Sequence, residues 1–139
     1  MVERKVFLDT AYAIALASQS DEYHDKAIAL AEQLEKQGTR LITTRAVLLE
    51  IGNALAKLQY RQAAVELLES LEQDSQITIV ACTDELFSRA FELFRKRPDK
   101  EWGLTDCISF VVMQEQGLQT ALTTDEHFQQ ASYHALLRE

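Results

Sequence analysis

The sequence predicts an α/β fold in which helices cover both faces of a parallel sheet, and three observations support this prediction. Short apolar runs rich in β-branched residues alternate along the chain with longer segments of helical periodicity. Strands that alternate with helices in this way are joined by crossovers and run parallel. The length of 139 residues, with 47% hydrophobic and 26% charged side chains, fits one soluble domain over residues 1–139.

The first part of the chain is predicted to contain two strands separated by two helices. β-branched and aromatic residues mark the strands, good helix formers mark the helices, and Gly38 stops the second helix. The predicted elements are a β-type segment from Val2 that ends in the run Val6–Leu8, helices over Ala11–Ser18 and Asp21–Gln37, and a strand at Leu41–Thr43.

The middle of the chain is predicted to contain two amphipathic helices and a strand. Thr44 can cap a helix over Arg45–Gln59, and a second helix follows over Arg61–Gln73 before a strand at Ile77–Val80. The inward stripe predicted for the first of these helices consists of Val47, Glu50, Ile51, Ala54, Leu55 and Leu58. That of the second consists of Ala64, Leu67, Leu68 and Leu71.

The last part of the chain contains the segment that is hardest to assign. Residues Leu104–Gln116 have a strand-like composition, but their length, Thr105 as an N-cap and Gly117 as a stop favour a buried helix. The other predicted elements are a helix from the capping residue Thr83 to about Arg97, stopped by Pro98, a strand at Thr120–Thr123, a short final helix and a strand near Tyr133–Leu136.

Two aspartates directly follow predicted strands, at the edge where parallel sheets bind ligands. Asp9 follows the first strand, and Asp125 follows the strand at Thr120–Thr123. In open parallel sheets the ligand site lies outside the carboxyl ends of the strands. Each residue alone is more often an N-cap of the next helix, so the functional interpretation depends on further residues at the same edge.

A glutamate and a third aspartate are expected near that edge. Glu50 occupies an inward position of its helix, and glutamates are rarely buried unless they are paired or bound. It could also reach solvent at the rim of the helix. Asp106 lies in the first turn of the most hydrophobic predicted helix, where its charge could equally complement the helix dipole.

Four carboxylates that converge on one cleft favour a divalent cation. Their repulsion in a partly dry pocket is relieved either by raised pKa values or by a bound cation. Oxygen ligands without a histidine and cysteine cluster suit Mg²⁺ or Mn²⁺ better than zinc. Such an ion lowers the pKa of a bound water and stabilises charge on a phosphate, which suits phosphodiester hydrolysis.

Four segments that contain these carboxylates resemble PIN domains, in particular the compact VapC-type ribonuclease toxins. They are Phe7–Thr10, Leu49–Leu55, Leu104–Ser109 and Leu122–Phe128, in the order found in that family. The resemblance implies a three-layer α/β/α sandwich with a central parallel sheet. It also implies an endoribonuclease that depends on Mg²⁺ or Mn²⁺, forms a homodimer and is inhibited by an antitoxin encoded alongside.

The resemblance also implies roles for individual residues. Asp9, Glu50, Asp106 and Asp125 match the acidic metal and catalytic residues of the family. Thr10, Asn53, Thr105 and Ser109 match supporting positions, although capping and packing would explain Ser109 equally well. The glycine–phenylalanine pair common near the C-terminus of such proteins is replaced by Ser132-Tyr133, which puts the last strand in doubt.

The charge balance is unfavourable for an RNA-binding protein. The net charge is −8, whereas phosphate binding normally leaves a basic surface, although two divalent ions would offset four negative charges.

Trp102 is expected to cover the core rather than to stack on a base, and His127 to pack or to bond to its loop rather than to act in acid–base catalysis. The candidate RNA contacts are Arg45, Lys57, Arg61, Arg95, Lys96, Arg97 and Lys100, of which residues 95–97 are also typical of a solvated helix end.

Other classes of protein fit less well. A haloacid dehalogenase phosphatase needs a second aspartate two residues after the first, where this chain has Ala11. No stretch is long and apolar enough to span a bilayer, and two cysteines without metal-ligand spacing indicate reduced thiols, so a cytoplasmic protein is expected. The serious alternative is a catalytically silent PIN domain that binds RNA or protein without cutting.

Overall fold

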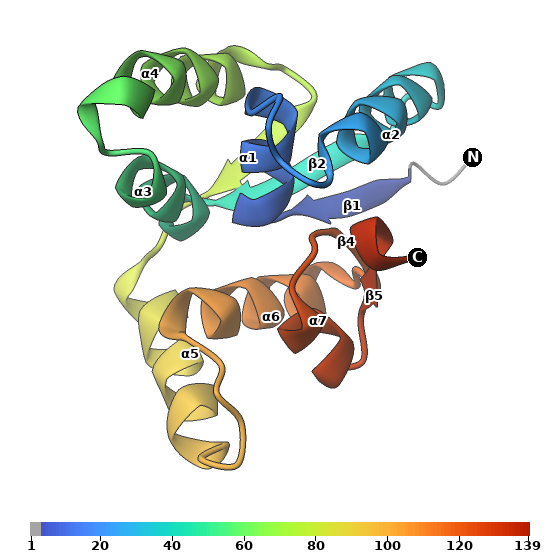
Figure 1. Cartoon of the computed structure of the whole chain (residues 1–139). Coiled ribbons are helices and arrows are strands. Elements are labelled where there is room, and N and C mark those ends of the chain that lie inside the picture. The colour runs from blue at the N-terminus through green and yellow to red at the C-terminus, as the bar shows by residue number, and fades with distance from the viewer. Residues whose placement is uncertain (1–3) are drawn as a thin grey trace.

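The computed structural model describes residues 4–139, and in this part of the chain five parallel strands form one sheet with helices on both faces (Figure 1). The order across the sheet is β3-β2-β1-β4-β5. Each neighbouring pair is parallel. The strands are β1 (Lys5–Leu8), β2 (Arg40–Thr44), β3 (Ile77–Val80), β4 (Thr120–Leu122) and β5 (His134–Ala135).

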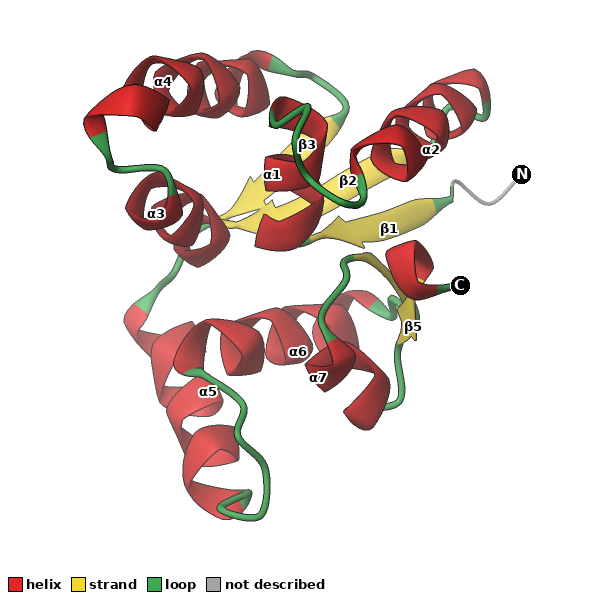
Figure 2. Ribbon diagram, in the orientation of Figure 1, coloured by secondary structure: helices red, strands yellow, loops and turns green. Residues whose placement is uncertain are grey.

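Two groups of helices enclose this sheet, which confirms the predicted three-layer architecture. Figure 2 shows the strands between a group formed by α1–α4 and a group formed by α5–α7. The first group is α1 (Thr10–Ala17), α2 (His24–Lys36), α3 (Arg45–Ala54) and α4 (Leu58–Gln73). The second group is α5 (Asp84–Lys96), α6 (Leu104–Gln116) and α7 (Glu126–Gln130), and a 3-10 turn at Leu136–Arg138 follows β5.

The direction in which strands are added reverses between β1 and β4. From β1 the chain adds β2 and then β3 toward one edge, and it returns through α5 and α6 to place β4 on the other side of β1. Strand β4 pairs with β1, with Ala121 opposite Phe7 and Leu122 opposite Leu8. A reversal of this kind opens a crevice at the carboxyl ends of the two strands, which is where ligands bind in open α/β sheets.

The core is centred on β1 and α6. Val6, Phe7 and Leu8 are each at most 1% exposed, and every residue of α6 from Cys107 to Met113 is buried. The buried-helix prediction for Leu104–Gln116 is therefore confirmed with the predicted bounds, and Gly117 ends the helix in the left-handed conformation at φ 69°. The strand expected near Tyr133–Leu136 is also present, as the two-residue β5.

The helix predicted over Arg45–Gln59 is shorter than expected, and its inward stripe is wrong at Ala54 and Leu58, whereas Leu55 packs against the core as predicted. Helix α3 ends at Ala54, which is exposed, and α4 begins at Leu58, whose exposure is 92%. The Arg61 side chain donates from Nε and Nη2 to Ala56 O at 3.1 and 2.6 Å. This contact satisfies a carbonyl that a continuous helix would have bonded internally, so the chain can break there.

Other element ends differ by a few residues from the predictions. Helix α2 starts at His24 because Asp21 forms a turn, in which its Oδ1 accepts the Tyr23 N–H at 2.8 Å. The N-cap of α6 is Gly103 rather than Thr105, and β4 stops at Leu122 rather than Thr123. Strand β1 begins at Lys5, and the predicted start at Val2 lies outside the described residues.

Candidate active site

The four candidate carboxylates belong to elements that begin at the carboxyl edge of the sheet. Asp9 directly follows β1, and Asp125 lies three residues after the end of β4 at the N-cap of α7. Asp106 is in the first turn of α6, the helix that runs back along the sheet to β4, and Glu50 lies in α3, which follows β2. Asp9 and Asp125 therefore flank the crevice between β1 and β4.

Asp9 is a buried carboxylate that does not act as a helix cap. It is 4% exposed and makes no side-chain capping hydrogen bond, although it occupies the N-cap position of α1. Its Oδ2 accepts a hydrogen bond from Thr123 Oγ1 at 2.7 Å. The N-cap alternative that the sequence favours for a carboxylate after a strand therefore does not account for Asp9.

Burial raises the pKa of Asp9 to about 7, because the charged form loses its hydration. Hydrogen bonds from the Thr123 hydroxyl and the Thr10 backbone oppose this shift, and the negative charges of Asp106 and Glu50 add to it. The charges of Asp106 in α6 and Glu50 in α3 therefore both influence the ionisation of Asp9.

Asp106, Asp125 and His127 form the tightest cluster of potential ligand atoms among the described residues, within 4.8 Å of one another. His127 Nδ1 lies 3.1 Å from Asp106 Oδ2 and 3.3 Å from Asp125 Oδ1. Burial and the Asp125 charge raise the pKa of Asp106, while hydrogen bonds from the Gly103 N–H and His127 oppose the shift. Asp125 differs from Asp9 because its Oδ1 caps α7 by accepting the His127 N–H at 2.8 Å.

Thr123 connects the two strand-end aspartates and was not among the residues predicted for the site. It is completely buried, donates its hydroxyl proton to Asp9, and accepts the Asp125 N–H at 2.9 Å. One side chain therefore fixes a carboxylate after β1 and the backbone of a carboxylate after β4. The only sequence signal is its position, at the end of a strand and two residues before Asp125.

The four supporting residues lie in different environments. Thr10 is buried, and its Oγ1 has no hydrogen-bond partner among residues 4–139. Ser109 is buried and donates to Thr105 O at 3.0 Å, one turn earlier in α6. This bond is the kind of local backbone contact that serine makes inside helices. Thr105 is half-buried and Asn53 is exposed on α3.

The donor set fits a hard divalent cation. Asp9, Asp106 and Asp125 offer carboxylate oxygens in a partly dry environment, and burial, together with the charges of neighbouring carboxylates, raises the pKa values of Asp9 and Asp106. The unpartnered hydroxyl of Thr10, adjacent to Asp9, is a further oxygen donor without a protein partner in the described part of the chain. These are the groups that such an ion would satisfy.

The candidate RNA contacts are mostly engaged in ion pairs. Arg45 pairs with Glu72, Arg95 pairs with Glu92, and Lys96 lies 3.4 Å from Glu92. Arg97 pairs with Asp99 at 2.9 Å and lies over the Trp102 ring at 5.1 Å. All of these pairs are exposed enough to exchange partners at little cost.

Trp102 packs as part of the core, as expected from the sequence. It is 6% exposed, donates from Nε1 to Gln130 Oε1 at 3.0 Å, and meets Phe110 edge-to-face at 5.0 Å between ring centroids. Its ring is therefore not available to stack on a base in this conformation.

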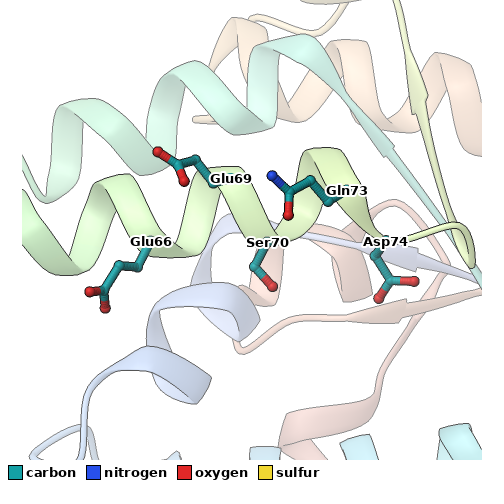
Figure 3. A pocket seen from close by; sticks show the side chains of 5 residues that line it. All are labelled: Glu66, Glu69, Ser70, Gln73 and Asp74. Carbon is teal, nitrogen blue, oxygen red and sulfur yellow. The ribbon is translucent and has the colours of Figure 1, made fainter.

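Two hollows in the described structure are not lined by the candidate carboxylates. One is an open depression of about 440 Å³ along α4, lined by Glu66, Glu69, Ser70, Gln73 and Asp74 (Figure 3). The other, of about 220 Å³, lies between α5, α6 and the segment after α7, where Arg97, Trp102 and Tyr133 contribute to its wall. Neither is lined by any of the four candidate carboxylates.

Comparison with known proteins gives matches over nearly the whole chain. A model of the family described as PIN domain matches residues 6–132. The 23S rRNA-specific endonuclease VapC20 of Mycobacterium tuberculosis is 26% identical over 128 residues, which cover 92% of this chain and 95% of the relative. The crystal structure of that protein, described as a Sarcin-Ricin loop cleaving toxin, has a TM-score of 0.80 at 25% identity, over 92% of this chain and 95% of that one.

Two further solved structures share the fold. VapBC2 from Rickettsia felis, bound to a DNA fragment from its promoter, has a TM-score of 0.69 at 15% identity, and covers 94% of this chain and 96% of that chain. FitAcB from Neisseria gonorrhoeae has a TM-score of 0.65 at 18% identity, over 94% of both chains. Within residues 4–139, no helix has the length and apolar composition needed to cross a membrane.

Proposed function

Because the chain belongs to the PIN domain family, we propose that it is an endoribonuclease that requires Mg²⁺ or Mn²⁺ and acts as the toxin of a type II toxin–antitoxin pair. The endonuclease activity of the relative VapC20 supports the nuclease assignment. The VapC20 structure, described as that of a cleaving toxin, supports the toxin assignment. The catalytic and metal-binding residues in this proposal are Asp9, Glu50, Asp106 and Asp125.

One observation carries the proposal. Asp9 is 4% exposed, and no cationic side chain of the described residues lowers its pKa. The negative charges of Asp106 and Glu50 raise its pKa further. Burying a carboxylate next to like charges costs free energy unless a cation or a proton is bound. A domain without metal chemistry would gain stability by replacing Asp9 with a neutral residue.

The side chains have distinct tasks in this proposal. Asp9, held by Thr123, and Asp106, held by the Gly103 N–H at 3.1 Å, present oxygens in fixed positions. A bound divalent cation would lower the pKa of the attacking water and stabilise the charge that develops on the phosphate. Glu50 and Asp125 complete the acidic group, and the exposed Arg45, Lys57 and Arg61 would contact the RNA backbone.

The decisive experiment is cleavage of RNA by the purified protein in the presence and absence of divalent ions. Cutting is expected with Mg²⁺ or Mn²⁺ and not with EDTA. Asp9→Asn and Asp106→Asn should each reduce the rate by at least about 100-fold, because they remove a charge and preserve the shape. Asp25→Asn, on the exposed first turn of α2, is the matched control and should cut normally.

The outcome that contradicts the proposal is equally clear. If Asp9→Asn and Asp106→Asn fold and cut RNA as fast as the parent protein, the activity belongs to a different site. If no RNA is cut with any divalent ion, the second candidate gains support, a silent PIN domain that binds RNA or protein. The net charge of −8 and the ion-paired arginines are the observations that favour that candidate.

The proposed partners are RNA, an antitoxin and a second copy of the chain, in the cytoplasm. For the homodimer, α5 offers a surface on which Phe87, Phe91 and Phe94 form a stacked row, with 46%, 46% and 43% exposure. The first turn of α5 contains Asp84 and Glu85, and its last turn contains Arg95 and Lys96. Two copies of this helix packed antiparallel would match the aromatic row with itself and each acidic turn with a basic turn.

A further inference from the structure

We propose that His127 is itself a ligand of the divalent ion and makes the site favour Mn²⁺ over Mg²⁺. The proposal rests on the metal-dependent function above and adds a nitrogen atom to a ligand set that the sequence motifs describe as purely acidic. It concerns a side chain that the sequence analysis assigned to packing or to a bond with its own loop.

The first argument is the position of the imidazole. His127 Nδ1 faces two carboxylate oxygens from different helices, 3.1 Å from Asp106 Oδ2 and 3.3 Å from Asp125 Oδ1. Adjacent ligands of an octahedral ion with bonds of about 2.1 Å lie about 3 Å apart, which is √2 times the bond length. His127 Nδ1 therefore already has the spacing of a neighbouring ligand to each of the two carboxylate oxygens, and all three residues offer ligand atoms within 4.8 Å of one another.

The second argument is that the backbone holds this arrangement from both sides. The Asp125 carboxylate caps α7 by accepting the His127 N–H at 2.8 Å, so the aspartate and the histidine belong to one rigid turn. Asp106 Oδ2 is fixed by the Gly103 N–H at 3.1 Å. The side chains of Asp106, Asp125 and His127 are only 15%, 31% and 26% exposed, which limits the alternative positions of the ring.

The choice of ion follows from ligand chemistry. Mg²⁺ prefers carboxylate, carbonyl and water oxygens and binds imidazole poorly, whereas Mn²⁺ and the later transition metals accept a neutral imidazole nitrogen. A set of carboxylate oxygens with one imidazole nitrogen therefore increases the affinity for Mn²⁺ more than for Mg²⁺. Without the histidine, the remaining oxygen ligands would discriminate less between the two ions.

The test is pulsed electron paramagnetic resonance of the full chain with Mn²⁺ bound. Coordination by His127 predicts a ¹⁴N coupling to Mn²⁺ that disappears in His127→Gln and changes to a ¹⁵N pattern when the histidines of the parent protein are ¹⁵N-labelled. His24→Gln and His134→Gln are matched controls that should retain the coupling, since His24 Nδ1 is bonded to Ala15 O and His134 is on β5. If His127→Gln does not fold, the labelled parent protein together with the two control variants still assigns the coupling to His127.

Calorimetric titration supplies a second, independent measurement. His127→Gln should weaken Mn²⁺ binding about tenfold or more and Mg²⁺ binding much less, so the preference for Mn²⁺ should shrink. Bound Mn²⁺ without any ¹⁴N coupling, or a coupling that persists in His127→Gln, would overturn this inference while leaving the nuclease proposal intact. A parent protein that binds neither ion would overturn both.

Discussion

Asp9 combines the strongest burial of the four carboxylates with a pKa near neutrality. Loss of hydration raises the pKa of Asp9 from 3.8 to about 7, and the charges of Asp106 and Glu50 act in the same direction. In the metal-free protein this group is thus protonated at mildly acidic pH and ionised above about pH 7. The proton and the cation compete for the same oxygens, because a ligand must release its proton before it binds a metal.

This shift predicts that the metal-free protein becomes less stable as the pH rises from about 4 to about 7. In that window the native state keeps a proton on Asp9 that the unfolded chain has released, so raising the pH favours unfolding. The rise in the pKa of Asp9 from 3.8 to about 7 corresponds to stabilisation on the order of 4 kcal/mol, complete below about pH 4 and lost above about pH 7.

Urea unfolding with EDTA between about pH 5 and about pH 8 measures this effect. Asp9→Asn should remove the part of the pH dependence of the unfolding free energy that comes from the proton on Asp9. The variant should also be more stable than the parent protein above about pH 7. Equal slopes for the parent and the variant would show that Asp9 titrates normally.

Two buried threonines make a second, paired prediction. Thr123→Val removes a donor to Asp9 and an acceptor for the Asp125 N–H, so it should cost about 1–3 kcal/mol. Thr39→Val should be neutral or stabilising, because Thr39 is 5% exposed and its Oγ1 has no partner among the described residues. Urea unfolding of both variants compares them directly, and equal losses would contradict the assigned hydrogen bonds.

The sequence supplied candidates for an acidic site, but not the hydrogen-bond partners of these residues. Asp9 and Asp125 were candidates because they follow predicted strands, Glu50 and Asp106 because of their positions in predicted helices, and the motif resemblance includes all four. Thr123 and His127 could not be selected in the same way, because their partners, Asp9 after β1 and Asp106 in α6, are far from them in the sequence. Their roles depend on which elements become neighbours in the folded chain.

At the scale of elements, α6 shows how burial can override local composition. Its run from Cys107 to Met113 has the residues of a strand, yet it forms a helix that is buried throughout this run. Length and the glycine at its end were better guides than β propensity, because a helix covered on all faces has no polar side to reveal its period.

Two glycines of these helices allow a matched test. Gly117 ends α6 at φ 69°, so Gly117→Ala should cost about 1 kcal/mol through backbone strain. Gly52 lies inside α3, where an added Cβ would meet only Leu68 Cδ1, at 3.8 Å, so Gly52→Ala should stabilise the protein by up to about 1 kcal/mol. Thermal unfolding measures both, and shifts of Tm in the same direction would contradict this account.

The break between α3 and α4 could not be read from the sequence. The residues from Asn53 to Tyr60 contain no proline and no glycine, and their apolar spacing is compatible with one continuous helix. The structure instead ends the helix at Ala54 and uses the Arg61 side chain to satisfy Ala56 O. A side-chain contact of this kind leaves no periodic signal, so the predicted inward position of Leu58 was wrong.

At the scale of the whole molecule, alternation of elements predicted the class of fold but not the order of the strands. Parallel strands with helices on both faces follow from the alternation alone. The adjacency of β1 and β4 depends on pairing between Phe7 and Ala121 and between Leu8 and Leu122, across most of the chain. This adjacency brings the segments that contain Asp9 and Asp125 to the same crevice.

The proposed dimer can be tested by disrupting the aromatic row of α5. Phe91→Glu places a charge at the centre of the row, next to Phe87 and Phe94, and should shift the protein toward a monomer in light scattering after size-exclusion chromatography. Leu58→Glu, at an apolar residue with 92% exposure on α4, is the control and should not change the mass. A monomeric parent protein would refute the proposed homodimer.

The pairing of β1 with β4 also bears on synthesis at the ribosome. Strand β1 emerges before its neighbour β4, which is made more than a hundred residues later. A nascent chain that has not yet reached Asp125 lacks the second wall of the crevice and two of the candidate ligand groups, Asp125 and His127. The proposed site of Asp9, Glu50, Asp106 and Asp125 is therefore incomplete until the start of α7 has been made, so shorter translation products should not cut RNA.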